Sequence, residues 1–218
     1  MIKNIVFDFG CILTGLDKQR CVDALRKVGA GRIAYYVDEC KQEDLFHELE
    51  IGNSTVHEFC EEARRQCSYT EDGVLHKSEV TDEDIVWAWS ELLLGVPEAK
   101  LRKILELRQS GKYRIMVLSN TNIIHWEQAL GNFFSGKGVE NIDASLTVDD
   151  FFDKVYLSYK MHKVKPDACI FEEMLRDSGA KAEETLFIDD SKANCEGAKA
   201  LGINVIYDPT GTEWMDKI

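Results

Sequence analysis

The sequence predicts an α/β fold: a Rossmann-like parallel sheet core with an inserted small helical cap. Short apolar runs alternate with helical segments over the second half of the chain. A similar apolar run stands near the start, and a long helical interval without a convincing strand follows it. Strands that alternate with helices indicate a parallel sheet, so we expect the long helical interval to be an insertion after the first strand.

Five apolar runs are the predicted strands. Runs of this length and composition are typical of strands that are buried on both faces of a parallel sheet. They cover residues 5–7, 114–118, 154–157, 185–188 and 203–207.

Helices are predicted between these strands. One covers residues 97–112, with Pro97 at its start and Gly111 at its end, as the preferences of helix termini favour. Two more, residues 169–179 and 192–202, also end at glycine. These helices complete the expected α/β core.

The interval after the first strand contains four predicted helices: residues 17–29, 42–52, 54–67 and 81–95. Thr55 and Glu58 have the spacing of a capping box, and Thr81 with Asp84 resembles one. We therefore predict a core domain of residues 1–15 and 96–218, and a helical cap domain of residues 16–95.

A buried helical face is expected near the end of this interval. Trp87, Leu92 and Leu93 fit such a face.

Composition limits the classes of partner. The chain has 218 residues, of which 44% are hydrophobic, so a packed core is expected. Its formal net charge of −13 argues against binding to nucleic acids or anionic membranes. An anionic small substrate stays compatible, because a metal ion and one lysine reverse the charge locally. The oligomeric state is left open.

Cysteine usage favours a cytoplasmic protein with reduced thiols. The seven cysteines form no CxxC pair and their number is odd. Asp8 interrupts the apolar start too early for a signal peptide, and no run of 18 apolar residues suggests a membrane span. A nucleophilic Cys11 is the less favoured alternative to an ordinary thiol.

Polar residues stand where the predicted strands end, and in parallel sheets ligands bind beyond these carboxyl ends. Crowded carboxylates need a cation, and oxygen ligands suit Mg²⁺. A carboxylate can attack phosphorus, while a lysine and a hydroxyl hold phosphoryl oxygens. Each residue alone has an ordinary explanation as a cap or loop residue, but together they indicate a phosphoryl-transfer site. The residues are Asp8, Ser119, Asn120, Lys165, Asp189 and Asp190.

Four segments carry a resemblance to the haloacid dehalogenase-like (HAD) hydrolase superfamily: DFGCILT, LSNTN, KVKPDACIF and FIDDSKANCEGAKALG. The resemblance covers essentially the whole chain. SNTNIIH and LSYKMHKVKPD are most similar to the bacterial sugar-phosphatase branch, which includes α-D-glucose-1-phosphate phosphatase. The resemblance implies a Mg²⁺-dependent phosphatase that acts through an aspartyl-phosphate intermediate. Its expected substrate is a small phosphorylated metabolite, with the sugar phosphates as the expected class.

The resemblance also implies residue roles. Asp8 is expected to be the nucleophile and a metal ligand. The backbone carbonyl of Gly10 and the carboxylate of Asp190 complete the protein ligands, with Asp189 in support. Phosphate binding is expected from Ser119, the amide of Asn120, and Lys165, which also bridges the nucleophile and the phosphate.

Gly10 is a departure from the family pattern. Typical family phosphatases have a second aspartate there, which protonates the leaving group and activates water; losing such a group costs about 10²–10⁴-fold in rate. We therefore expect proton transfer through water or another group, or a leaving group that is easily expelled, such as an anomeric oxygen. Asp17 is a candidate substitute, although a solvated hinge residue is the expectation.

Two alternative functions are kept. A haloacid dehalogenase also lacks the second aspartate, but it works without a metal and the pair Asp189–Asp190 does not suit an anionic halo-acid. The other is a catalytically weak binding protein that retains the fold. The substrate and the cap residues that contact it are not predicted from the sequence.

Overall fold

A five-stranded parallel sheet forms the centre of the computed structural model, which describes residues 1–38, 44–134 and 142–218. Its order is β7–β6–β1–β8–β9, and every neighbouring pair is parallel. The predicted strands agree with the observed ones within one residue at each end, so the predicted fold class is confirmed. The strands are β1 (Asn4–Phe7), β6 (Arg114–Ser119), β7 (Lys154–Leu157), β8 (Thr185–Asp189) and β9 (Asn204–Tyr207).

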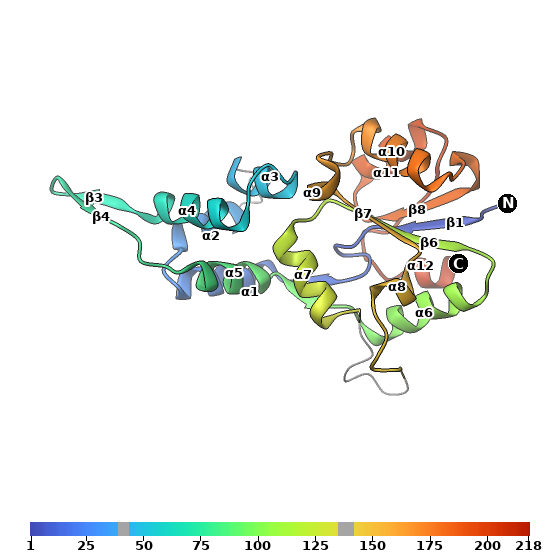
Figure 1. Cartoon of the computed structure of the whole chain (residues 1–218), viewed down its shortest axis with the longest axis horizontal. Coiled ribbons are helices and arrows are strands. Elements are labelled where there is room, and N and C mark those ends of the chain that lie inside the picture. Colours follow the sequence, from blue (N-terminus) through green and yellow to red (C-terminus); the bar gives the residue numbers. More distant parts are fainter. Residues whose placement is uncertain (39–43, 135–141) are drawn as a thin grey trace.

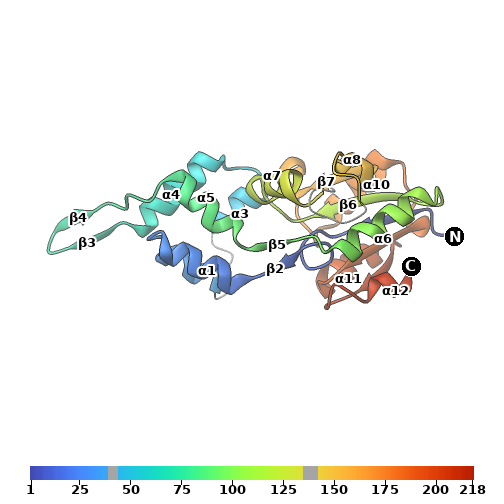
Figure 2. The same cartoon turned by 90° about the horizontal axis from the view of Figure 1, so that it is seen from below.

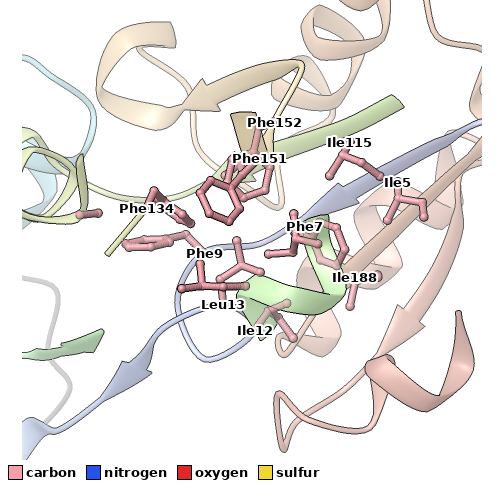
Figure 3. Packing of buried hydrophobic residues seen from close by; sticks show 14 of the residues in the cluster. Ile5, Phe7, Phe9, Ile12, Leu13, Ile115, Phe134, Phe151, Phe152 and Ile188 are labelled. Atoms are coloured by element: carbon pink, nitrogen blue, oxygen red, sulfur yellow. The ribbon is translucent and has the colours of Figure 1, made fainter. Parts of the chain in front are cut away.

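Helices cover both faces of the sheet (Figure 1). Side chains alternate along β1, so Ile5 and Phe7 enter one apolar cluster and Val6 enters another. The first cluster is packed against α6 (Glu98–Gln109), α8 (Val148–Phe151) and α12 (Trp214–Lys217), and Figure 3 shows a part of it, with aliphatic and aromatic side chains. The second cluster is packed against α10 (Ala168–Ser178) and α11 (Lys192–Ala200). Burial on both faces explains why these strands are apolar throughout.

The helical region lies at one end of the sheet (Figures 1 and 2). It has its own apolar cluster, which includes Leu25, Ile33, Phe59 and Ile85. No helix in the described part of the chain is long and apolar enough to cross a membrane. The helices are α1 (Lys18–Lys27), α2 (Gly31–Asp38), α3 (Asp44–Glu50), α4 (Val56–Cys67) and α5 (Asp82–Ser90).

Both expected N-caps of this region are formed. The amide of Glu58 donates to Thr55 Oγ1 over 3.2 Å, and the amide of Thr55 donates to Glu58 Oε2 over 2.8 Å. These two bonds make the capping box of α4. At α5, the amide of Asp84 donates to Thr81 Oγ1 over 3.1 Å.

A two-stranded antiparallel ladder joins the helical region to the sheet. It pairs β2 (Gly15–Leu16) with β5 (Leu93–Gly95), and Thr14 Oγ1 donates to the carbonyl of Gly95 over 3.0 Å. The domain boundaries expected after residues 15 and 95 fall in this ladder. We propose that the helical region is a separate cap domain with these boundaries.

The expectation of no strand between residues 16 and 95 is wrong. Besides β2 and β5, this interval contains an antiparallel hairpin of β3 (Tyr69–Glu71) and β4 (Val74–His76). Asp72 and Gly73, at its turn, have φ values of 48° and 77°. An Asp-Gly pair between two β-prone runs is the sequence signal that could have revealed the hairpin.

The helix expected over residues 81–95 is shorter than predicted. It ends at Ser90, and Leu93 is buried in β5 rather than on a helix. Trp87 is on the helix but is 42% exposed, so its expected burial is wrong. The run of three leucines forms an extended connection because it returns to the ladder with β2.

The remaining elements connect the sheet to its site. They are α7 (Ile123–Asn132), α9 (Ser158–Met161) and the short 3₁₀ helix η1 (Ala182–Glu184). α7 follows β6 and packs against α5, whereas α9 directly follows β7. Both therefore begin at the carboxyl edge of the sheet.

Candidate active site

Three carboxylates meet at the carboxyl edge of the sheet. Asp8 directly follows β1, Asp189 is the last residue of β8, and Asp190 follows it. Each offers an oxygen, and these oxygens lie within 4.8 Å of one another. Asp8 and Asp189 are buried, whereas Asp190 is half-buried. The repulsion between three clustered carboxylates and their all-oxygen donor set suit a hard divalent cation such as Mg²⁺.

Lys165 lies between two of these carboxylates. Its Nζ donates to Asp8 Oδ1 and to Asp189 Oδ2, both over 2.7 Å, and to the carbonyl of Leu118 over 3.0 Å. Burial lowers the pKa of Lys165, but the two carboxylates outweigh it and raise the pKa above its usual value. The ammonium group therefore stays charged beside Asp8.

One ammonium group does not balance the charge of three carboxylates. Burial raises the pKa of Asp8 to about 7, while Lys165 opposes the shift and Asp189 adds to it. Burial and the neighbouring Asp189 also raise the pKa of Asp190. A divalent cation among these oxygens would favour their ionised forms, which a nucleophilic carboxylate requires.

Asp189 and Asp190 have different surroundings. Asp189 accepts hydrogen bonds from the amide of Ser191 over 2.7 Å and from Asn194 Nδ2 over 3.1 Å, besides the one from Lys165. Asp190 has a side-chain hydrogen bond with the thiol of Cys11. The oxygens of Asp189 are thus engaged in holding the site, whereas those of Asp190 are more available to a cation.

Asn194 is a site residue that the sequence reasoning missed. It lies in the first turn of α11, which begins right after the paired aspartates. An amide side chain in the first turn of the helix that follows a functional strand end points back toward that end, and this position is the signal that could have identified it.

The structure brings Ser119 and Asn120 to the same edge. Ser119 ends β6 and is 1% exposed, and among the described residues its Oγ has one long contact, 3.4 Å to the carbonyl of Asn120. The side chain of Asn120 is bonded to the backbone of Lys165 instead. All the residues expected at the site, Lys165 included, therefore converge on one edge of the sheet.

Gly10 follows Asp8 in the loop that leaves β1. Its carbonyl accepts a hydrogen bond from the amide of Ile12 over 2.5 Å, which leaves one lone pair for another partner. A Cβ atom at this position would lie 3.6 Å from Leu16 Cδ1, an ordinary contact, and φ is not positive. The backbone therefore does not require glycine here.

Neither Asp17, the candidate substitute for the missing acid, nor Cys11, the alternative nucleophile, has the surroundings of a catalytic group. Asp17 is the N-cap of α1, where its carboxylate accepts from the amide of Arg20 over 2.9 Å. Burial and the negative charge of Asp190 raise the pKa of the Cys11 thiol to about 12, so this thiol stays protonated and is a poor nucleophile.

Comparison with known proteins agrees with this geometry. A family model described as haloacid dehalogenase-like hydrolase matches residues 135–207. Over 218 residues the chain is 35% identical to a D-ribitol-5-phosphate phosphatase of Bacteroides thetaiotaomicron, covering 100% of this chain and 97% of that protein.

Solved structures of HAD family proteins are also similar to this chain. A HAD family enzyme from Bacteroides thetaiotaomicron, crystallised with magnesium and inorganic phosphate, is 35% identical, with a TM-score of 0.85 over 100% of both chains. A HAD-like hydrolase from Porphyromonas gingivalis is 34% identical, with a TM-score of 0.81 over 100% of this chain and 96% of that one. The chain belongs to the haloacid dehalogenase-like hydrolase superfamily.

Proposed function

We propose that this protein is a Mg²⁺-dependent phosphatase that forms an aspartyl-phosphate at Asp8. The observation that carries the proposal is the position of Lys165 Nζ, 2.7 Å from both Asp8 and Asp189, with Asp190 in the same carboxylate cluster. A nucleophile, a cation site and a fixed positive charge are the parts that phosphoryl transfer needs.

Asp8 attacks the phosphorus atom with a carboxylate oxygen. Lys165 neutralises charge next to this oxygen and binds a phosphoryl oxygen. Ser119 Oγ and the backbone amide of Asn120 hold the other phosphoryl oxygens, because both lie at the end of β6, the neighbour of β1. These groups are fixed before the reaction, so no reorganisation is needed as charge develops.

Asp8, Asp190 and the carbonyl of Gly10 would hold the Mg²⁺ ion, with Asp189 supporting the site through its hydrogen bonds. The ion, when bound, offsets the negative charge of the carboxylates and of the phosphate. The difference between the surroundings of Asp189 and Asp190 supports this division of roles.

The substrate class is a sugar or sugar-alcohol phosphate. The relative whose name states D-ribitol 5-phosphate favours a primary alkyl phosphate on an open-chain polyol. The resemblance to α-D-glucose-1-phosphate phosphatase favours an anomeric phosphate instead. We favour the first, because it rests on a relative aligned along the whole chain. The partner is thus a small phosphorylated metabolite, and the free thiols of six described cysteines support a cytoplasmic location.

A phosphate-release assay tests the function. The purified protein is incubated with D-ribitol 5-phosphate, α-D-glucose 1-phosphate and p-nitrophenyl phosphate, with Mg²⁺ or with EDTA. Release that needs Mg²⁺ supports the proposal. Halide release from a 2-halo-acid in EDTA would identify a dehalogenase, and the absence of both reactions would indicate a binding protein that retains the fold.

A further inference from the structure

A carboxylate of the helical region interacts electrostatically with the lysine of the site. Glu50 is the last residue of α3, and its side chain is half-buried. The charged groups that act on this carboxyl group are His47, on the same helix, and Lys165. Among the described residues, none forms a hydrogen bond or ion pair with the Glu50 carboxylate. The group is therefore close to the site and available to a substrate.

The end of α3 is bonded to the carboxyl edge of the sheet (Figure 1). Ser158 Oγ donates to the carbonyl of Glu50 over 2.7 Å, and His162 Nδ1 is 2.9 Å from the carbonyl of Ile51. Ser158 begins α9, directly after β7. These bonds involve the backbone of residues 50 and 51, so they leave the side chain of Glu50 unengaged.

Gly52 allows this close approach. Its φ is +74°, and a Cβ atom there would lie 2.0 Å from the carbonyl oxygen of Tyr159. Any other residue would push the segment off α9. The chain is thus built to hold Glu50 against the sheet edge.

The same serine hydroxyl reaches the loop after β6. Ser158 Oγ accepts from the amide of Thr121 over 2.9 Å and lies 2.8 Å from the carbonyl of Thr121. Thr121 follows Asn120, whose amide is proposed to bind phosphate. One fully buried hydroxyl therefore fixes the position of Glu50 relative to the phosphate-binding loop.

We propose that Glu50 supplies the proton transfers for which Gly10 has no side chain; this inference rests on the proposed phosphatase function. In the first step an oxygen of Asp8 bonds to phosphorus, the bond from phosphorus to the leaving oxygen breaks, and that oxygen takes the proton of Glu50. In the second step a water oxygen bonds to phosphorus, its proton passes to Glu50, and the bond from phosphorus to Asp8 breaks with its electrons returning to the carboxylate.

The chemistry of the substrate class makes such a group necessary. A primary alkoxide is a poor leaving group, and a positioned acid contributes about 10²–10⁴-fold to its expulsion. Burial raises the pKa of Glu50, while His47 and Lys165 oppose the shift. A raised pKa keeps a larger fraction of the group protonated near neutral pH, as a proton donor requires.

The test compares Glu50→Gln with Glu48→Gln. Glu48 is on the same helix, but it lines a different cavity, together with Asn53, Ser54 and Glu58. The substrates are p-nitrophenyl phosphate, whose leaving group needs no proton, and the primary alkyl phosphate that the wild type hydrolyses fastest. Melting temperatures are measured first. If Glu50→Gln does not fold, Glu50→Asp, which withdraws the carboxyl group by one methylene, replaces it in the same comparison.

Glu50→Gln should lower kcat on the alkyl phosphate by about 10²–10⁴-fold. With p-nitrophenyl phosphate it should give a fast burst of about one p-nitrophenolate per enzyme, then slow turnover, because hydrolysis of the aspartyl-phosphate has lost its base. Mass spectrometry after acid quench should find the phosphoryl group on Asp8.

Equal losses on both substrates without a burst, or behaviour like that of Glu48→Gln, would overturn the role of Glu50. These results leave the proposed function intact, since the wild type still releases phosphate. A wild type that releases no phosphate from any of the monoesters would instead refute the proposed function itself.

Discussion

The side chain of Asn120 forms two hydrogen bonds with the backbone of Lys165. Asn120 Nδ2 donates to the carbonyl of Lys165 over 2.9 Å, and Asn120 Oδ1 accepts from its amide over 2.8 Å. The two residues are 45 positions apart in the chain. Asn120 thus fixes the position of the loop that carries Lys165, and Lys165 forms ion pairs with Asp8 and Asp189.

Asn120→Ala should therefore misplace Lys165. A shift of about 1 Å in a positioned group costs about 10²-fold in kcat, and two unpaired backbone groups cost about 1–3 kcal/mol each in unfolding free energy. Urea denaturation and steady-state kinetics measure the two effects. The control is Asn204→Ala, which also removes two hydrogen bonds to the backbone, both to carbonyls, but at the opposite end of the sheet. Equal kcat in both variants would contradict the positioning role.

Asp8→Asn should abolish phosphatase activity and keep the fold. The amide has the size of the carboxylate but cannot attack phosphorus. It also removes one charge from the carboxylate cluster, while Lys165 keeps its bond to Asp189. Thermal melting should give a stability equal to or above that of the wild type, and phosphate release should fall to background. Substantial turnover by this variant would exclude an aspartyl-phosphate at Asp8.

Asp190→Asn should weaken Mg²⁺ binding more than Asp189→Asn. Asp190 has few competing partners, whereas Asp189 is engaged with Lys165, Ser191 and Asn194. Asp189→Asn should instead destabilise the fold by about 3 kcal/mol, because one oxygen of this fully buried group, which accepts bonds from Lys165, Ser191 and Asn194, becomes an amide nitrogen that cannot accept them. Calorimetric titration with Mg²⁺ and thermal melting separate the two variants. If Asp189→Asn weakened Mg²⁺ binding more than Asp190→Asn, Asp189 would be the direct ligand instead of Asp190.

Gly10→Asp should fit the structure and supply an acid. A Cβ atom at this position meets only Leu16 at 3.6 Å, and the backbone has no positive φ. In the Glu50→Gln background, the substitution should raise kcat on alkyl phosphates by at least about tenfold, within the contribution of a positioned acid. Gly10→Asn is the control, since it has the size of aspartate without the proton. Equal rates for both variants would show that position 10 does not reach the leaving oxygen.

His125 should make stability depend on pH. Its Nε2 donates to the carbonyl of Trp89 over 3.0 Å, and its Nδ1 accepts from Asn122 Nδ2 over 3.2 Å, so the neutral ring is fully bonded. Burial lowers its pKa from 6.5 to about 4, against the weaker effect of the bond to Trp89.

Between pH 6.5 and 4 the unfolded state therefore binds more protons at His125 than the folded state. Stability should fall as the pH decreases through this window, by on the order of 3 kcal/mol from this residue, and the loss should be absent above pH 6.5. The unfolding free energy, measured by denaturation at a series of pH values, should depend less on pH in this range for His125→Gln than for the wild type.

The sequence predicted the regular parts of the core well, because burial on both faces makes each strand a short apolar run. The hairpin was missed because its six residues are all exposed and carry no apolar alternation. Trp87 was misjudged for a related reason: composition indicates that an aromatic residue prefers burial, but the packing of α5 leaves this one at the surface.

The chain itself determined which residues stand at the strand ends, because parallel strands place their carboxyl ends at one edge. Asp8, Ser119 and the Asp189–Asp190 pair follow from that rule alone. Only the tertiary structure decided the approach of Glu50 and the two bonds by which Asn120 holds Lys165. Their contacts join elements far apart in the chain or depend on how one helix meets another, and local sequence patterns contain no information about such distances.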